Sequence, residues 1–391
     1  MFSNQGEMTQ LDSGLAKVDS IYHARSQRAR ELKEKGKKVI SYFCLVTPLE
    51  FLTALDIVPY RMFGSLREPI TLADAHLESI MCPFVRSCLD LTLKGEYEFV
   101  DGIIVPHTCD NIEKTYNIWK FLSKFPFCHY LNLPHMSFTS SLEFFKEELI
   151  RLKKSLESFV GRAISLEQLI QAIRICNETR YLLRELYELR KEDPPRISGV
   201  EVTKLMVAGL SIPVAEWNEL LRQVIQETKK REERPDHRAR LLVLGSEIDD
   251  IALIQLVEDS GGNVVVDDLC TGTRLFRDVV EITDDPLDGL ARFYLYENRC
   301  SRTYRTSETE NWKEDLENRF GHVLKYAEEF NARGVILYTL RFCDSVELDV
   351  PVLSKYLKDA GLRVLHIEDD YSMRAVGQLR TRIQAFLEMI D

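Results

Sequence analysis

Several signatures are missing from the 391-residue sequence. No stretch approaches about 18 uninterrupted apolar residues, so we expect nothing that spans a membrane. No basic patch with interleaved aromatic residues occurs, and the net charge is −11, which argues against nucleic-acid binding. The first residues show no basic stretch followed by an apolar one, so we expect no secretory signal. A soluble, cytoplasmic protein is the expectation.

Nucleotide-binding motifs are missing too. The sequence has no G-x-x-x-x-G-K-[ST] loop, and the turn "GSEIDD" lacks the glycine spacing of a dinucleotide fingerprint. If ATP is used, we therefore expect a partner protein to bind and hydrolyse it. The absence of a Cys-x-x-Cys pair excludes a zinc ribbon and the common ferredoxin pattern.

Nine cysteines are nevertheless present. Disulfides are not expected in a reducing cytosol, which leaves buried apolar fillers, catalytic thiols or metal ligands. If the thiols bind metal, they must converge from separate parts of the fold.

Buried-strand patterns alternate with helical ones in two regions of the chain. Between these regions, the apolar residues recur at three- and four-residue intervals, which predicts amphipathic helices. Alternating strands and helices imply parallel sheets. We expect an α/β protein with two similar flavodoxin-like parallel-sheet domains and a helical segment between them. The expected divisions are an N-terminal helical segment 1–36, a first domain 37–140, a helical middle 141–237 and a second domain 238–391.

Four cysteines fall at or just past predicted strand ends, where parallel sheets bind ligands. The sequence around two of them repeats: Cys109-Asp110 and Cys343-Asp344 both follow a strand and precede a helix, which the aspartates could cap. One further cysteine, Cys82 or Cys300, lies between the two strand-end cysteines of each half. Each half therefore contains three thiols, which could hold a four-iron cubane. Alternatively, these cysteines could be small buried hydrophobic residues, and their spacing alone does not decide between the two interpretations. The two sets are Cys44, Cys82 and Cys109, then Cys270, Cys300 and Cys343.

The other candidate functional residues can each be explained by an ordinary structural role. His107 could donate a proton, although a strand-end histidine is more often satisfied by backbone. Glu50 could be catalytic, but a helix dipole explains an acid near a helix start equally well. Cys128 and Cys176 read as core residues, and Cys88 is a substitute ligand at most. Arg274 reads as a structural or docking residue.

The sequence resembles the 2-hydroxyacyl-CoA dehydratase and benzoyl-CoA reductase superfamily over nearly its whole length. The resemblance rests on "TPLEFLTALDIVP", "MCPFVRSC", "DGIIVPHTCD", "VVVDDLCTGTR", "FCDSVELDVP" and "IEDDYSMRAVGQLRTRIQAFLEM". It implies that Cys82, Cys109 and Cys343 correspond to the three cysteines that hold one 4Fe-4S cluster in dehydratase subunits. The further match of Cys44, Cys270 and Cys300 makes the chain most similar to the double-cubane cluster branch.

That branch implies an oxygen-sensitive, homodimeric iron-sulfur reductase of anaerobic metabolism. Its two bridged four-iron cubanes carry out ATP-dependent, low-potential reduction of a small molecule, with electrons from a separate ATP-hydrolysing iron-sulfur activator. The alternative is a one-cluster subunit of a 2-hydroxyacyl-CoA dehydratase or benzoyl-CoA reductase, paired with a different subunit. A third hypothesis is that the protein is not an enzyme but an electron carrier or a scaffold that matures clusters for other proteins. The six cysteines could divide by domain, or cross between domains with Cys82, Cys109 and Cys343 as one set. The resemblance favours the crossed division.

Overall fold

The first parallel sheet lies in the N-terminal half of the chain. We describe a computed structural model covering residues 13–390 except positions 233, 235, 237, 298, 299, 304–310 and 373. The first twelve residues of the predicted segment 1–36 and the predicted boundary at 237 lie outside the described residues. The strands pair in the order β2-β1-β3-β4, all in parallel. They are β1 (Val39–Tyr42), β2 (Val58–Arg61), β3 (Gly102–Pro106) and β4 (Phe127–Leu131).

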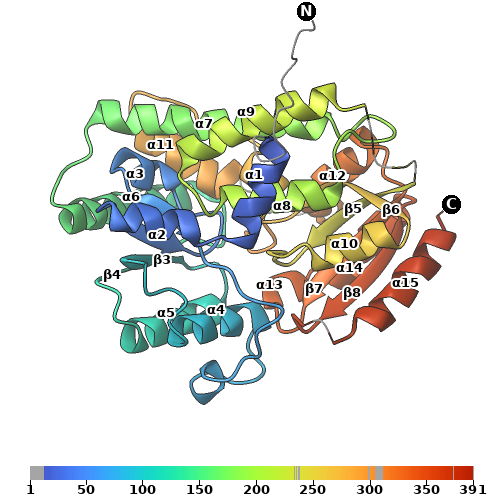
Figure 1. The fold of residues 1–391 in the computed structure, drawn as a ribbon, viewed down its shortest axis with the longest axis horizontal. Coiled ribbons are helices and arrows are strands. Elements are labelled where there is room, and N and C mark those ends of the chain that lie inside the picture. The colour runs from blue at the N-terminus through green and yellow to red at the C-terminus, as the bar shows by residue number, and fades with distance from the viewer. Residues whose placement is uncertain are drawn as a thin grey trace, which may run out of the picture.

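The second sheet repeats this plan. Its strands pair in the order β6-β5-β7-β8, again all in parallel. They are β5 (Ala239–Gly245), β6 (Gly262–Asp268), β7 (Gly334–Leu340) and β8 (Arg363–Asp369). The two sheets stand in separate halves of the molecule (Figure 1). The prediction of an α/β fold with two flavodoxin-like parallel-sheet domains is confirmed.

Helices cover the faces of both sheets. The inner strands β1, β3, β5 and β7 are buried along their whole length, whereas the edge strand β8 is largely exposed or half-buried. This burial explains the continuous apolar runs of the inner strands. In the first half the helices are α1 (Gly14–His23), α2 (Gln27–Glu34), α3 (Leu49–Ala54), η2 (Ala73–Ala75), α4 (Pro83–Leu93) and α5 (Asp110–Leu122). In the C-terminal half of the chain they are α10 (Ala252–Asp259), η3 (Thr273–Leu275), α11 (Pro286–Arg292), the π-helical η4 (Phe293–Glu297), α12 (Trp312–Glu329), α13 (Asp344–Glu347), α14 (Val350–Asp359) and α15 (Val376–Glu388). Of these, α11 and η4 pack with the half of the molecule that holds the first sheet, where α11 contacts α6.

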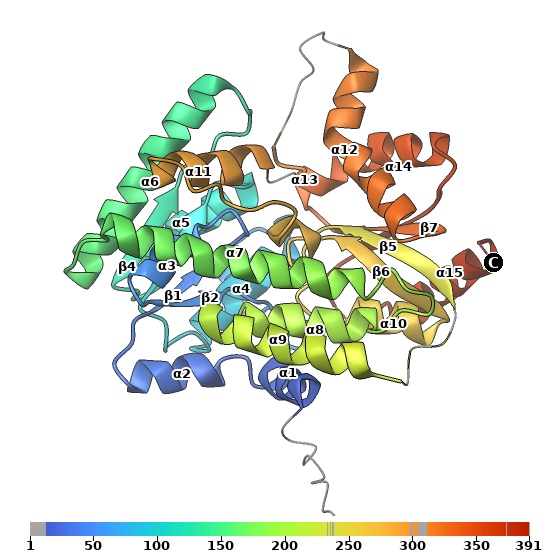
Figure 2. The same ribbon diagram turned by 90° about the horizontal axis from the view of Figure 1, so that it is seen from above.

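Four helices lie between the two sheets in the chain. They are α6 (Thr139–Val160), α7 (Leu166–Glu188), α8 (Gly199–Gly209) and α9 (Val214–Lys230). The predicted capping box at Ser165 and Gln168 starts α7. From there α7 runs from the half that holds β1 to the half that holds β6 (Figure 2), so it packs on both. No described helix is long and apolar enough to cross a bilayer.

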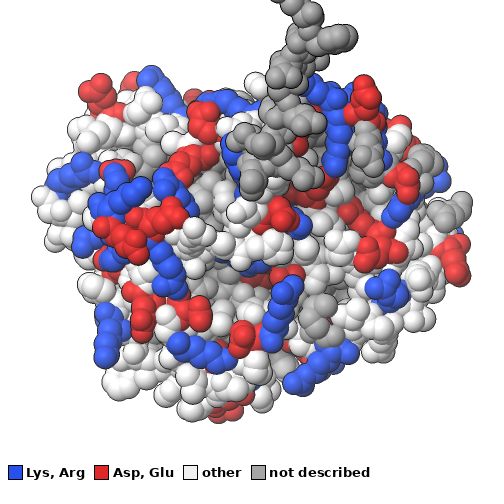
Figure 3. All heavy atoms as spheres, viewed as in Figure 1, with Lys and Arg blue, Asp and Glu red and all other residues white. Residues whose placement is uncertain are grey.

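The face of the molecule in Figure 3 carries both signs of charge. Lys and Arg side chains are interspersed with Asp and Glu over this face, and neither sign forms a continuous area. This face therefore offers no extended basic surface of the kind that tracks a phosphate backbone.

The backbone at Gly245, the last residue of β5, accommodates only glycine. Its φ is +138°, and a Cβ at this position would lie 1.8 Å from the carbonyl oxygen of Tyr338 on β7. We expect Gly245→Ala to lower the free energy of unfolding by about 1–3 kcal/mol, the usual range for overpacking. Urea denaturation would measure the change. Gly361→Ala is the control, because Gly361 also has a positive φ, +89°, but its Cβ would meet nothing within 4 Å. Equal losses in both variants would contradict the clash.

Candidate iron-sulfur site

All six predicted cysteine ligands line one cavity, which together with its opening to solvent holds about 670 Å³ of empty space and which we call the thiol cavity. Residues from the carboxyl ends of β1, β3, β6 and β7 contribute to it, so strand ends of both sheets face the same space. Ligands bind at this edge of parallel sheets. The fold therefore brings together thiols that are up to 299 positions apart in the chain (343 − 44). They are Cys44, Cys82, Cys109, Cys270, Cys300 and Cys343.

Three of these thiols share one kind of position. Cys82, Cys109 and Cys343 are the N-caps of α4, α5 and α13. The backbone amide of Val85 hydrogen-bonds to the sulfur of Cys82, and that of Ile112 to the sulfur of Cys109, and both bonds act to lower the thiol pKa. Helix N-termini stabilise thiolates in this way. We call this group, drawn from both domains, the cap triad.

The other three form the second triad: Cys44, Cys270 and Cys300. Hydrogen bonds connect Cys270 to both Cys44 and Cys300. Arg274 Nη1 also donates to Cys270 Sγ over 3.6 Å. Cys44 has a left-handed backbone with φ of +45°. Such strain in a residue other than glycine is typical of functional sites.

Burial dominates the acid-base properties of the cap triad. It raises the pKa of Cys109 to about 12 and of Cys343 to about 11, and it raises the pKa of Cys82 well above its usual range. In the second triad, the hydrogen bond with Cys270 lowers the pKa of Cys44. The thiols of the cap triad are therefore neutral at pH 7 unless a metal takes the place of the proton.

Three buried arginines form a cationic wall that the sequence did not reveal. Arg61, Arg274 and Arg302 all line the thiol cavity and are at most 5% exposed. Nε and Nη1 of Arg61 and Nε of Arg302 find no hydrogen-bond acceptor among the described residues. Buried donors without acceptors are rare, so an anionic group with acceptor atoms fits this wall. Of these three arginines, the sequence singled out only Arg274, four residues after Cys270, and we interpreted it as a structural or docking residue.

The spacing of the thiols bears on which metal group fits. Thiolates around one tetrahedral ion lie about 3.8 Å apart, given metal–sulfur bonds of about 2.3 Å. Over the residues that the structure describes, the one group of three ligand atoms within 4.8 Å of one another is His107, Asp110 and Glu113. Among the described residues, no three of the thiols therefore lie close enough together to share a single ion. A cluster of several irons, each taking one thiolate, fits this wider arrangement and the cationic wall.

The remaining cysteines lie elsewhere. Cys88, Cys128 and Cys176 do not line the thiol cavity. Cys88 and Cys176 are buried, and Cys128 is half-buried on β4. These positions agree with a packing role, including for Cys88, which we considered as a substitute ligand.

The two candidate catalytic residues also lie outside the thiol cavity's lining. Glu50 on α3 is completely buried, where its carboxylate accepts hydrogen bonds from Arg180 and Tyr294, both over 2.8 Å. His107 lies against His135, with 4.9 Å between ring centroids, and 3.5 Å from Glu113.

The acids after Cys109 and Cys343 do not cap their helices. Neither α5 nor α13 has a side-chain cap, because the preceding cysteine is the N-cap in each case. Asp344 instead accepts a hydrogen bond from Asn111 Nδ2 over 3.3 Å. Asn111 also donates to the Phe342 carbonyl, so this side chain ties the two halves together beside the cap triad.

Comparison with known proteins agrees with the resemblance. The family model for the D-component of 2-hydroxyglutaryl-CoA dehydratase matches residues 44–390. One subunit of the benzoyl-CoA reductase of Thauera aromatica is 28% identical over 348 residues, 87% of this chain and 88% of its own length. The (R)-phenyllactyl-CoA dehydratase beta subunit of Clostridium sporogenes is 26% identical over 374 residues, 95% and 97% of the two chains.

A third relative extends this range. The beta subunit of (R)-2-hydroxyglutaryl-CoA dehydratase from Acidaminococcus fermentans is 24% identical over 362 residues, 92% of this chain and 94% of its own. All three relatives are reductase or dehydratase subunits that match nearly end to end. This chain is therefore an enzyme component that belongs to the 2-hydroxyglutaryl-CoA dehydratase D-component family, within the 2-hydroxyacyl-CoA dehydratase and benzoyl-CoA reductase superfamily.

Proposed function

We propose that this protein is an iron-sulfur reductase that uses a double-cubane cluster for low-potential reduction of a small molecule. The observation that carries the proposal is the thiol cavity, in which six cysteines from both domains line one space. The cap triad matches the one-cluster pattern of the superfamily. The second triad supplies the three further thiols that a second cubane requires.

The residues around the thiols have separable roles in this proposal. The cap triad and the second triad each hold one cubane, a division that crosses the domains. Arg61, Arg274 and Arg302 offset the negative charge of the bound group and donate to it. Apolar side chains such as Phe84, which also lines the cavity, exclude water. Bound there, the bridged cubanes would supply electrons one at a time to a substrate.

A separate protein would supply those electrons. The sequence lacks a P-loop, which supports assigning ATP hydrolysis to an iron-sulfur activator that passes single electrons to this chain. The working unit in this proposal is a homodimer of the chain.

Anaerobic iron and sulfide analysis tests the proposal. Purified without oxygen, the protein should be brown, contain about eight irons per chain and run as a homodimer in size-exclusion chromatography. It should bleach and lose its iron in air. About four irons per chain would overturn the double-cubane assignment, and a colourless, iron-free protein would overturn every cluster assignment.

The names of the relatives favour a second candidate. Each relative named above belongs to a benzoyl-CoA reductase or a 2-hydroxyacyl-CoA dehydratase. In that case the chain would hold one cluster on the cap triad and act on a CoA ester beside a different, homologous subunit. A stable heterodimer on co-purification, with about four irons in this chain, would favour this candidate.

The raised thiol pKa values predict how iron retention depends on pH. Without metal, Cys109 and Cys343, with pKa values of about 12 and about 11, bind protons at neutral pH, and the loaded form does not. Lower pH therefore favours the metal-free form. We expect a chelator to remove more iron at about pH 6.5 than at about pH 8.5. Cys128→Ser is the control and should behave like the wild type, because Cys128 does not line the cavity. Equal loss at both pH values would contradict the prediction.

A further inference from the structure

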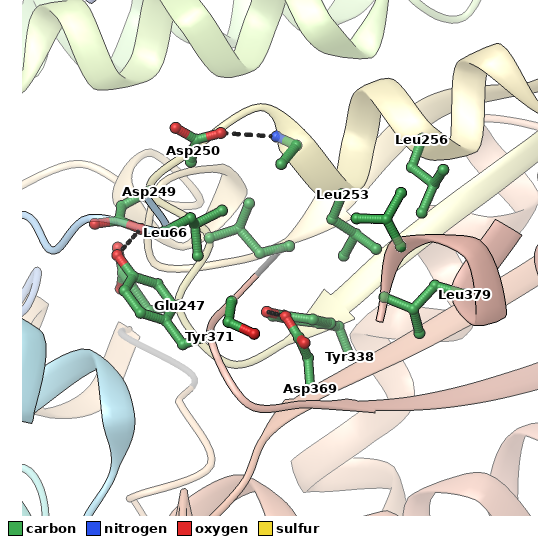
Figure 4. A pocket seen from close by; sticks show the side chains of 14 residues that line it. Leu66, Glu247, Asp249, Asp250, Leu253, Leu256, Tyr338, Asp369, Tyr371 and Leu379 are labelled. Carbon is green, nitrogen blue, oxygen red and sulfur yellow. Dashed lines mark hydrogen bonds between the residues drawn. The ribbon is translucent and has the colours of Figure 1, made fainter. Parts of the chain in front are cut away.

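A second pocket, which together with its opening to solvent holds about 460 Å³ of empty space, lies beside the thiol cavity, and we call it the acid pocket. One end of it gathers Glu247, Asp249 and Asp250, and the other end has apolar side chains including Leu253 and Leu379 (Figure 4). Asp369 also lines it, and two tyrosines order the carboxylates. Tyr371 donates to Asp249 over 2.7 Å, and Tyr338 donates to Asp369 over 2.9 Å.

Glu247 connects the acid pocket to the thiol cavity. It is the single described residue that lines both. It follows β5, whose carboxyl end faces the space between the domains. A side chain in this place separates the cluster ligands on one side from a group of carboxylates on the other.

The two carboxylate oxygens of Glu247 differ. Oε2 accepts a hydrogen bond from Arg61 Nη2 over 2.8 Å. Oε1 is buried and accepts no hydrogen bond from the described part of the chain. An unsatisfied buried oxygen is costly, so it has a partner in the working protein: a proton, a water molecule or a bound group.

We propose that Glu247 is a proton-transfer residue, which takes a proton from the acid pocket as each electron arrives and releases it into the thiol cavity. This inference rests on the proposed function. Every electron that the activator donates adds one negative charge to the thiol cavity. One hydronium ion that enters the acid pocket from solvent then gives its proton to the Glu247 carboxylate and leaves as water, so that a carboxyl O–H bond forms. On release, the carboxyl O–H bond breaks and its proton passes to the substrate in the thiol cavity, so that charge balances.

The electrostatic surroundings of Glu247 support this role. Burial raises the pKa of its carboxyl group, Arg61 acts to lower it, and the Asp249 carboxylate raises it further. A negative charge arriving in the thiol cavity raises proton affinity again. A carboxyl group whose pKa is raised holds a proton more readily than a solvent-exposed one, which suits a role in proton transfer. The charged and titratable groups that act on Glu247 are Arg61, Asp249, Arg274, Tyr42, Cys88 and Cys270.

The midpoint potential of the cluster measures this proton uptake. In the loaded, full-length protein, potentiometric titration followed by paramagnetic resonance should give a potential that falls as pH rises, because protonation accompanies reduction. Glu247→Gln keeps the shape of the side chain but cannot take up a proton. Its potential should lose most of this pH dependence with iron content unchanged, whereas Glu247→Asp should retain it.

Glu148→Gln is the matched control. Glu148 on α6 is also a buried glutamate paired with an arginine, Arg151 at 2.8 Å, but it lines neither the acid pocket nor the thiol cavity. It should leave the potential and its pH dependence unchanged. If Glu247→Gln fails to load iron, Leu253→Trp serves instead. It fills the acid pocket from the apolar side and should slow proton uptake after a stepped reduction several-fold.

Three results would overturn the inference without touching the proposed function. The first is an iron-loaded wild type whose potential does not change with pH. The second is a Glu247→Gln variant with the wild-type pH dependence, or an iron-loaded Leu253→Trp variant with the wild-type rate of proton uptake. The third is a loss of pH dependence on His322→Gln, because His322 lines a different cavity that also contains Cys300. A wild type that binds no iron would instead contradict the proposed function itself.

Discussion

Replacing Cys44, Cys270 or Cys300 by serine is expected to halve the iron content, from about eight to about four irons per chain, and to leave one intact cubane. A serine hydroxyl is a poor substitute for a soft thiolate ligand. The three residues form the second triad and hydrogen-bond to one another through Cys270. Iron analysis and paramagnetic resonance of the three variants would measure the loss. All three should give the same remaining spectrum.

Serine at any member of the cap triad should remove the other cubane. Cys128→Ser is the control and should keep the full iron content, because Cys128 does not line the thiol cavity. The outcome that contradicts the crossed division is specific. If Cys44→Ser resembled Cys82→Ser, while Cys270→Ser resembled Cys343→Ser, the cubanes would divide by domain.

Glu50→Ala is expected to lower the free energy of unfolding by roughly 3–5 kcal/mol, because it leaves the buried Arg180 without its counter-charge. Glu50 on α3 accepts hydrogen bonds from Arg180 on α7 and from Tyr294 on η4. Arg180 also donates to Asn177, whose amide donates to the Val280 carbonyl. The network thus joins α3, α7 and the segment from Val280 to η4, which lie far apart in the chain. Denaturant unfolding of the reduced, metal-free protein would measure the loss.

Glu219→Ala is the matched control for this network. Glu219 also pairs with an arginine, Arg222, but its side chain is 70% exposed. A surface pair contributes little, so we expect a change within about 0.5 kcal/mol. The double variant Glu50→Met with Arg180→Met should recover part of the lost stability, because it removes both buried charges. Equal effects of Glu50→Ala and Glu219→Ala would contradict the prediction. A catalytic role of Glu50 would instead lower turnover at unchanged stability.

The fold class could be predicted because it depends on local patterns. Strands buried on both faces need continuous apolar runs, as in "ARLLVLG" of β5 and "GVILYTL" of β7. Helix starts carry local signals as well, and the capping box at Ser165 marks the start of α7 correctly. The interpretation of Asp110 as a cap was wrong, since the residue before a helix and the first residue of a helix are difficult to distinguish without backbone geometry.

The candidate ligands could be identified for a similar reason. The carboxyl ends of parallel strands share an edge, so cysteines after predicted strands are natural candidates, and Cys82 and Cys300 lie between them in the two halves of the chain. Their convergence depends on how the two sheets face each other, which no local pattern encodes. The cationic wall is a clear example. Arg61 is part of β2, and nothing in "DIVPYRMFG" indicates that its guanidinium is buried beside thiols that follow it by more than 200 residues, such as Cys270.

The sequence by itself therefore determined the fold class, the superfamily and the set of six cysteines, because each follows from residue types in a local order. Only the tertiary structure decided which residues surround those thiols. Glu247 follows β5 in a segment that lacks any recognised motif, and the role that we propose for it rests on its lining two cavities at once. Burial and unpaired polar atoms arise from the packing of two domains and a helical middle. They are properties of the folded space between distant segments and not of any segment alone.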